Sequence, residues 1–257
     1  MWKGIDVSDN QGVIDWGQVA QKVDFAVLRS VRRSGKADYQ FVANLEGCQK
    51  HSIPMSVYKY TYAITPEAAR QEAQQVVELL QSHELVGTMV WWDVEDCKEL
   101  QPLGITKLTE CIRAAQDVIM AAGYNFGLYV GLHVYKGRWF DFDTFDGKRL
   151  WVARYYRGYR TMRFDDDPDQ RYKPSVDRKL TGWQYTSCGE LDGIKGDVDL
   201  DIAYEDPTLW SHPTVEPGVI YTVSVADVWT REQAEAIRQQ LAPLGVCGVI
   251  HKVKILG

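Results

Sequence analysis

The chain has 257 residues, of which 45% are hydrophobic and 12% aromatic, so it can bury a large core and lacks the composition of a disordered chain. Its formal net charge of −6 excludes the basic balance typical of nucleic-acid-binding proteins. No apolar run is long enough to cross a membrane, so we expect neither a nucleic acid nor a membrane as partner.

Eight strand-like runs, rich in β-branched and aromatic residues, recur at the spacing of β/α units. They predict an α/β fold, namely an irregular (β/α) TIM-like barrel with about eight strands and fewer helices. The expected strands are Lys3–Val7, Phe25–Val31, Met55–Ala63, Thr88–Glu95, Phe126–Val130, Leu150–Tyr155, Gly182–Thr186 and Val198–Ile202.

Two amphipathic stretches between these runs predict helices. Thr65 is an N-cap followed by Pro66, and apolar residues then mark one face as far as Leu80. A second stretch runs from Thr106 to Ala122. Residues 156–180 are polar and irregular, and they predict a long loop over the barrel.

The end of the chain differs from the rest in its pattern. Residues 206–218 contain Pro207, Pro213 and Pro217, which predict a stiff linker after a barrel of residues 1–205. Residues 219–257 alternate first like a strand, then like a helix face, and then like a strand again. They predict a small C-terminal βαβ-like module.

Acidic residues lie at the ends of three expected strands. Asp6 closes the first strand, Asp93 and Glu95 close the fourth, and Asp199 begins the last. In a barrel of parallel strands, the catalytic groups lie at the face where the strands end. A single Asp-x-Glu pair is usually an exposed pair, so it is the three strand ends together that indicate a site.

Asp93 and Glu95 are two residues apart and therefore point to the same face of a strand. Two acids among aromatic residues cannot both ionise easily, so one should keep its proton near neutral pH. We expect Glu95 to be the buried member of the pair. Glycoside hydrolysis needs such a proton donor with a second carboxylate beside it.

Several aromatic residues are candidates for binding sugar rings, which stack on aromatic side chains. Tyr58, Tyr60 and Tyr62 alternate along the third expected strand and so face one side, whereas Tyr129 and Trp183 lie near other strand ends. For each residue taken alone, packing in the barrel core is the alternative role. The five histidines and five cysteines show no metal-binding spacing, so we expect no metal and no cofactor.

A set of motifs resembles the family-25 glycoside hydrolases, the Chalaropsis-type lysozymes of phage endolysins and bacterial autolysins. The motifs follow the family's order over about residues 1–205. They include Gly4-Ile5-Asp6-Val7-Ser8, Ser56-Val57-Tyr58-Lys59-Tyr60, Trp92-Asp93-Val94-Glu95, Trp183-Gln184-Tyr185 and Val198-Asp199-Leu200.

The resemblance implies a muramidase that cleaves the β-1,4 bond between N-acetylmuramic acid and N-acetylglucosamine in peptidoglycan. By matched motif, Glu95 is the general acid/base, Asp93 and Asp199 stabilise or orient the reacting sugar, and Asp6 completes the acidic floor. A protein nucleophile and the substrate's own acetamide remain alternative routes. The last motif departs from the usual Val-Asp-x-Asn, because Asp201 stands in place of the Asn.

Two other functions remain open: a barrel that binds cell-wall glycan without cutting it, and a hydrolase of another aminosugar polymer such as chitin. The intact acids argue against the first, and the absence of a DxxDxDxE run argues against the second. The module at 219–257 resembles half of a SPOR-type domain, and we expect it to bind the wall or to pair two chains. Because no signal peptide is evident, we expect a phage endolysin made in the host cytoplasm and acting on the wall after release.

Overall fold

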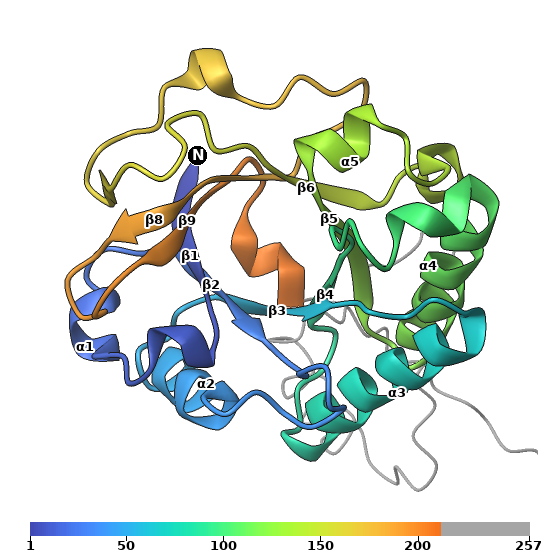
Figure 1. Ribbon diagram of the computed structural model, residues 1–257. Coiled ribbons are helices and arrows are strands. Elements are labelled where there is room, and N and C mark those ends of the chain that lie inside the picture. The colour runs from blue at the N-terminus through green and yellow to red at the C-terminus, as the bar shows by residue number, and fades with distance from the viewer. Residues whose placement is uncertain (212–257) are drawn as a thin grey trace, which may run out of the picture. The chain divides into compact units, whose positions relative to one another are not determined.

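A single sheet dominates the computed structural model, which describes residues 1–211 (Figure 1). The sheet closes into a barrel because β6 pairs with β8. The eight barrel strands confirm the predicted α/β barrel, with ends shifted by a few residues. They are β1 (Trp2–Val7), β2 (Phe25–Arg29), β3 (Met55–Tyr60), β4 (Met89–Asp93), β5 (Asn125–Gly131), β6 (Arg149–Ala153), β8 (Gly182–Glu190) and β9 (Val198–Ala203).

One barrel strand runs against the others. Neighbouring strands from β1 to β6 pair in parallel, and β8 is parallel to β6, whereas β9 is antiparallel to both β8 and β1. The first residues of β9 therefore lie at the end of the barrel where the other strands finish. An acid at the start of β9 and an acid at the end of β1 thus meet at one face.

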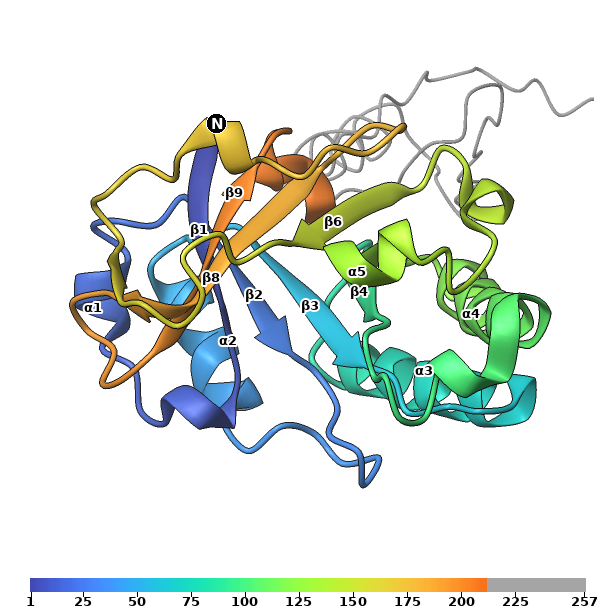
Figure 2. The same cartoon turned by 45° about the horizontal axis from the view of Figure 1, so that its top comes forward.

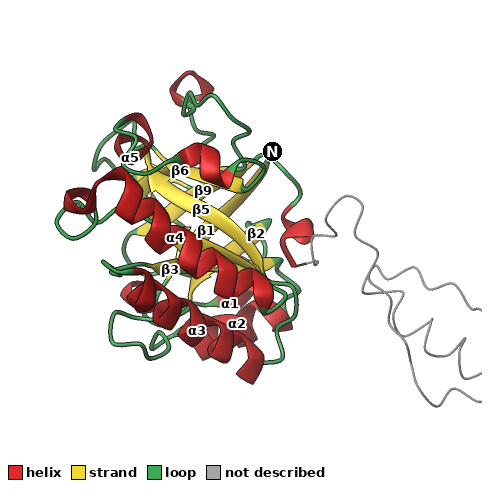
Figure 3. Cartoon of the chain, turned by 90° about the vertical axis from the view of Figure 1, so that its right-hand side faces the viewer, coloured by secondary structure: helices red, strands yellow, loops and turns green. Residues whose placement is uncertain are grey.

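The helices pack on the outside of the sheet and are fewer than the strands, as predicted (Figures 1 and 3). The Thr65 side chain accepts a hydrogen bond from the Ala68 N–H at 3.2 Å, so it caps the helix that Pro66 begins. No helix within residues 1–211 is both long enough and apolar enough for a membrane crossing. The α-helices are α1 (Trp16–Val19), α2 (Phe41–Lys50), α3 (Pro66–Ser82), α4 (Gly104–Ala121) and α5 (Leu132–Lys136).

The long loop predicted for residues 156–180 passes over the outside of β8 and β9, where no helix lies (Figures 1 and 2). It includes the two-residue strand β7 (Met162–Arg163), which pairs with the end of β8. Phe164 is buried, and Lys22 forms an ion pair with Asp165 at 2.8 Å. The loop therefore covers this side of the barrel as the helices cover the other.

Large aromatic rings fill the interior of the barrel. Each ring lies against a glycine directly opposite on the neighbouring strand, at a place where an added Cβ would lie less than 3 Å from the ring. Glycine is required there because any side chain would overlap the ring. The pairs are Phe25 with Gly4, Trp91 with Gly127 and Trp151 with Gly182.

A short 3-10 helix after β9, η5 (Pro207–Ser211), closes the end of the barrel opposite the acidic strand ends. Its Trp210 is fully buried, and its ring centroid lies 5.1 Å from that of Phe25 and 5.4 Å from that of Trp91. Trp210, which falls in the stretch predicted as a linker, thus packs with the interior of the barrel. The predicted module at 219–257 lies outside the described residues.

Candidate active site

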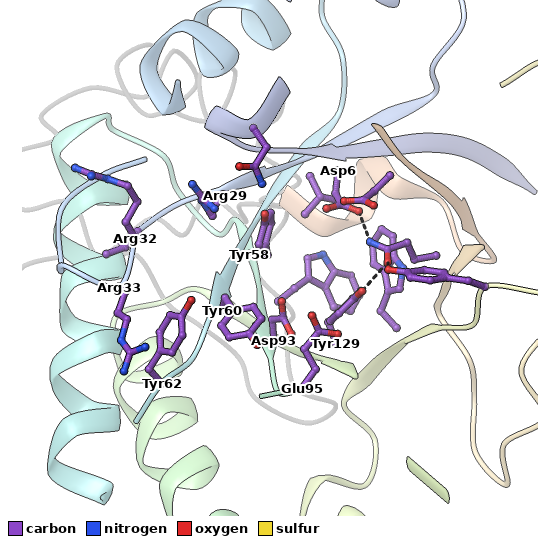
Figure 4. Close-up of a pocket in the computed structure, with 18 residues that line it drawn as sticks. Asp6, Arg29, Arg32, Arg33, Tyr58, Tyr60, Tyr62, Asp93, Glu95 and Tyr129 are labelled. Atoms are coloured by element: carbon purple, nitrogen blue, oxygen red, sulfur yellow. Dashed lines mark hydrogen bonds between the residues drawn. The ribbon is translucent and has the colours of Figure 1, made fainter. Parts of the chain in front are cut away.

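A pocket of about 550 Å³ opens at the face where the parallel strands end, a volume typical of ligand-binding sites. All four predicted acids line it: Asp6 from β1, Asp93 from the end of β4, Glu95 two residues beyond that end, and Asp199 from β9. Figure 4 shows Asp6, Asp93 and Glu95 gathered in the pocket. Asp6 and Asp199 are directly opposite each other in the antiparallel pair of β1 and β9. The fold therefore joins acids that are almost two hundred residues apart in the sequence.

The Asp-x-Glu pair differs from our prediction in which member is buried. Asp93 is the last residue of β4 and only 4% exposed, whereas Glu95 lies beyond the strand and is half-buried. Glu95 was expected to be the buried one, and that expectation is wrong because β4 ends two residues before it. Glu95 is consequently the acid that remains accessible to a substrate.

The electrostatics of the pair agree with a proton donor at Glu95. Burial first, and then the charges of Asp6 and Asp96, together raise the pKa of Glu95 to about 7. Burial, followed by the charge of Glu95, holds the pKa of Asp93 well above its ordinary value. Near neutral pH, Glu95 therefore exchanges its proton readily, as a general acid/base must.

Asp6 has a hydrogen-bond donor that fixes its orientation. The Gln184 side chain donates from Nε2 to Asp6 Oδ2 at 2.6 Å, and its Oε1 accepts hydrogen bonds from the phenols of Tyr129, at 2.7 Å, and Tyr155 (dashed lines in Figure 4). Two donors on Oε1 leave the Gln184 amino group to face Asp6. Burial raises the pKa of Asp6, but this hydrogen bond opposes the rise, so Asp6 is well placed to carry negative charge.

Two further carboxyls extend the acidic cluster. Asp201 is fully buried beside Asp6, and the two carboxyls share a hydrogen bond. Burial and then the charge of Asp6 hold the pKa values of Asp199 and Asp201 well above their ordinary value. Both carboxyls consequently keep their protons at a pH at which an exposed aspartate is ionised.

Four of the five predicted aromatic residues line the pocket, namely Tyr58, Tyr60, Tyr62 and Tyr129. Tyr62 lies beyond the end of β3, and its ring centroid is 4.8 Å from that of Tyr60. The two rings form a tilted pair that leads from Glu95 toward the rim (Figure 4). Such a surface is suited to the apolar faces of sugar rings.

Trp183 does not reach the pocket, and its predicted role in substrate binding is wrong. Its side chain is fully buried, its Nε1 donates to the Arg154 carbonyl at 3.0 Å, and its ring lies 5.9 Å from that of Tyr156. Residues on a strand alternate between its faces, so Gln184 points into the barrel and Trp183 points outward under the long loop. Trp183 is therefore a core residue.

Several residues that line the pocket were not among the site residues predicted from the sequence. Gln184 directly follows Trp183, so strand alternation could have placed one of the two inside the barrel, but not which one. Arg29 ends β2 and forms ion pairs with Asp9 and Asp38, which neutralise its charge. Within residues 1–211, no group of three or more His, Cys, Asp or Glu side chains is arranged to hold a metal ion.

Comparison with known proteins agrees with this geometry. The chain is 22% identical over 223 residues to the autolytic lysozyme of Clostridium acetobutylicum, across 84% of this chain and 60% of that protein. The chain therefore spans less than two thirds of the length of this curated relative. The catalytic domain of endolysin ply40, from bacteriophage P40 of Listeria monocytogenes, has a TM-score of 0.64 and 26% identity, covering 81% of this chain and 95% of the domain.

The modular autolysin LytC from Streptococcus pneumoniae has the same TM-score of 0.64 and 28% identity, with 79% of this chain and 46% of that protein covered. The profile described as glycosyl hydrolases family 25 matches residues 5–194, a range that holds Asp6, Asp93 and Glu95. This match covers most of the chain and confirms the resemblance found in its motifs. The chain belongs to family 25 of the glycosyl hydrolases.

Proposed function

We propose that the chain is a lysozyme, an N-acetylmuramidase that cleaves the β-1,4 bond between N-acetylmuramic acid and N-acetylglucosamine in bacterial peptidoglycan. The observation that carries the proposal is the position of Glu95. It is a half-buried acid with a pKa near 7 at the mouth of a pocket whose deeper wall holds Asp93, Asp6 and Asp199. Family membership supports it, as does the similarity to the autolysin LytC, whose structure is known in complex with a synthetic peptidoglycan ligand.

In this reaction, Glu95 donates its proton to the glycosidic oxygen while the bond from that oxygen to the anomeric carbon breaks. Positive charge then develops on the sugar ring above the carboxyl cluster. Asp6, which is held by Gln184, supplies negative charge to stabilise it. The ionised Glu95 afterwards takes a proton from the water that completes hydrolysis, so the proton returns to Glu95.

Asp93 lines the pocket beside Glu95 (Figure 4), and its Oδ1 has no hydrogen-bond partner among the described residues. An unpaired buried oxygen is costly unless a ligand completes it. We therefore assign Asp93 to contact with the reacting sugar, either by orienting its acetamido group or by attacking the anomeric carbon. Asp199 lines the same pocket beside Asp6, its partner in the pairing of β1 and β9.

The decisive experiment digests purified cell walls with the full chain and identifies the sugar at each new reducing end. A muramidase leaves N-acetylmuramic acid there, whereas a glucosaminidase leaves N-acetylglucosamine. Glu95→Gln should lower the rate by about two to four orders of magnitude without unfolding the barrel. Glu110→Gln, on the exposed side of α4, is the matched control and should keep wild-type activity.

Three results contradict the proposal. Binding of walls with no new reducing ends would indicate a non-catalytic glycan-binding barrel. Cleavage of chitin at the rate of peptidoglycan would indicate a different aminosugar polymer. Residual activity of Glu95→Gln above about a tenth of wild type would remove Glu95 from the proton-donor role, because loss of a general acid costs more than that.

The place of action and the role of the last residues are also proposals. We propose that the chain meets its substrate in the bacterial wall, after synthesis in a host cytoplasm, as a phage endolysin does. Residues 219–257 would increase the local concentration of the barrel on the wall, or pair two chains, without contributing to the chemistry. The stretch at 206–218, with its three prolines, separates these residues from the pocket residues along the chain and supports this division of roles.

A further inference from the structure

The pocket has a basic end opposite its acidic end. Arg32 and Arg33 follow β2 on a hairpin of residues 31–37, whose strands are joined by a bridge between Val31 and Ala37. Figure 4 shows both arginines on the side of the pocket away from Asp6 and Glu95, with the Tyr62 and Tyr60 rings between Arg33 and Glu95. The chain has a net charge of −6, so two neighbouring arginines on the rim of an acidic pocket are unusual. The partners of each arginine show which of their charges is compensated.

The positive charge of Arg33 is already compensated. Its guanidinium forms an ion pair with Glu99 at 3.1 Å and lies 4.4 Å from the centroid of the Tyr62 ring. Arg29, deeper in the pocket, is paired with Asp9 and Asp38. These two arginines therefore serve the internal structure of the site.

Arg32 is different, because no carboxylate within residues 1–211 forms an ion pair with it. Its Nε donates to the Ala37 carbonyl at 2.9 Å, and its guanidinium lies 3.6 Å from the centroid of the exposed Tyr39 ring. These two contacts fix the plane of the guanidinium and leave its terminal nitrogens without hydrogen-bond partners among the described residues. A fixed guanidinium binds a carboxylate with two parallel hydrogen bonds and loses little side-chain freedom.

We propose that Arg32 binds a carboxylate carried by a muramoyl substituent of the glycan, at a subsite separated from Glu95 by the Tyr60–Tyr62 pair. This inference rests on the proposed muramidase function. The sugar rings of the glycan are uncharged and stack on tyrosines, whereas its carboxylates occur on the lactyl group or on the peptide stem attached to it. The acids at one end of the pocket repel this carboxylate of the glycan, and Arg32 at the other end attracts it. The two effects together select the register in which the glycan lies.

Either the lactyl group or the peptide stem supplies the carboxylate, and three soluble glycan fragments distinguish these two sources. The first carries peptide stems with free carboxylates, the second carries the same stems fully amidated, and the third has no stems and so exposes the lactyl carboxylates. We measure kcat/KM of the full chain for each fragment. Variants are Arg32→Ala, Arg32→Lys, which keeps the charge but lacks the planar fork, and the matched control Lys36→Ala, an exposed cation on the same hairpin that does not line the pocket.

Wild type should favour one carboxylate-bearing fragment over the amidated one by about fivefold to tenfold, as expected for a partly exposed charge-assisted pair. Preference for the first fragment identifies the stem, and preference for the third identifies the lactyl group. Arg32→Ala should abolish the preference, Arg32→Lys should retain part of it, and Lys36→Ala should retain all of it. Raising the salt concentration should weaken the preference in wild type.

The inference is overturned if wild type cuts all three fragments equally well, or if Arg32→Ala keeps the wild-type preference. Either result leaves the muramidase function standing, because the fragments are still cut at the muramoyl bond. A wild-type chain that cuts none of the fragments overturns the proposed function and the inference together. The Tm of each variant is measured as a control. A Tm equal to that of wild type shows that a lost preference does not come from a loss of fold.

Discussion

Two truncations that differ by seven residues should give barrels of very different stability. A chain of residues 1–206 lacks η5 and its Trp210, whereas a chain of residues 1–213 keeps both. Trp210 is fully buried against the rings of Phe25, Trp91 and Trp151, and its Nε1 donates to Glu205 Oε1 at 3.0 Å. Removing it opens a cavity in the barrel interior at the end opposite the acidic residues.

The expected loss in the free energy of unfolding follows from the surface area of the buried Trp210 ring. Burial of a tryptophan removes about 150–250 Å² from water, worth roughly 4–6 kcal/mol at 25 cal/mol/Å², and core Trp→Ala changes cost about 3–5 kcal/mol. The 1–206 chain should therefore be less stable than the 1–213 chain by about 3–5 kcal/mol. In urea at 25 °C, the unfolding midpoint should fall by roughly 1–2 M.

Two variants of the 1–213 chain isolate the cause. Trp210→Ala should reproduce most of the loss, whereas Leu209→Ala, a residue of η5 that is 49% exposed, should change stability by about 0.5 kcal/mol or less. Equal midpoints for the 1–206 and 1–213 chains would refute the reasoning, because they would show that Trp210 adds nothing to the barrel. The 1–206 chain should also lose activity, since Trp91 and Trp151 line the pocket and rest on Trp210.

Three further predictions follow from the site and the chain's end. Because the pKa of Glu95 is raised to about 7 and its protonated form is the active one, kcat/KM on soluble fragments should fall about tenfold per pH unit above that value; a profile still flat at pH 8.5 would contradict the assignment. Burial holds the pKa of Asp201 well above the ordinary value, so the folded chain keeps a proton that the unfolded chain releases, and stability falls as the pH rises above about 4. Asp201→Asn removes that loss of stability. Calorimetry should show a Tm raised by roughly 2–4 °C or more at pH 8 and no gain near pH 3. An equal gain at both pH values would speak against a titration effect. Finally, the 1–213 chain should match the full chain on short soluble fragments and be slower on intact walls, and light scattering should show whether the full chain is larger than a monomer; a folded 1–213 chain that cannot cut short fragments would place the last residues in the active site.

Local patterns in the sequence were sufficient for the class of fold and for the acids of the site. Strand and helix periodicity depends on neighbouring residues, so the eight barrel strands and the helix capped by Thr65 could be predicted from short windows. The acids Asp6, Asp93, Glu95 and Asp199 could be singled out for a similar reason. The ends of barrel strands must meet at one face, whatever the rest of the chain does.

Local patterns could not determine which side of a strand faces the barrel interior. In β8, alternation permits either Trp183 or Gln184 to point inward, and only the pairing of β8 with β6 and β9 decides for Gln184. The depth of Asp93 relative to Glu95 likewise depends on where β4 stops pairing with β5. A shift of one residue would exchange the faces, so small errors in strand ends become large errors in side-chain placement.

Contacts between distant parts of the chain were decided only by the closed barrel. Asp199 meets Asp6 because the last strand runs antiparallel, and Trp210 enters the interior because that strand delivers the chain to the opposite end. The sequence by itself determined the strands, the helix faces and the chemical groups of the site. The tertiary structure decided which of those groups meet, because strand order and closure are properties of the whole barrel, and no short segment contains them.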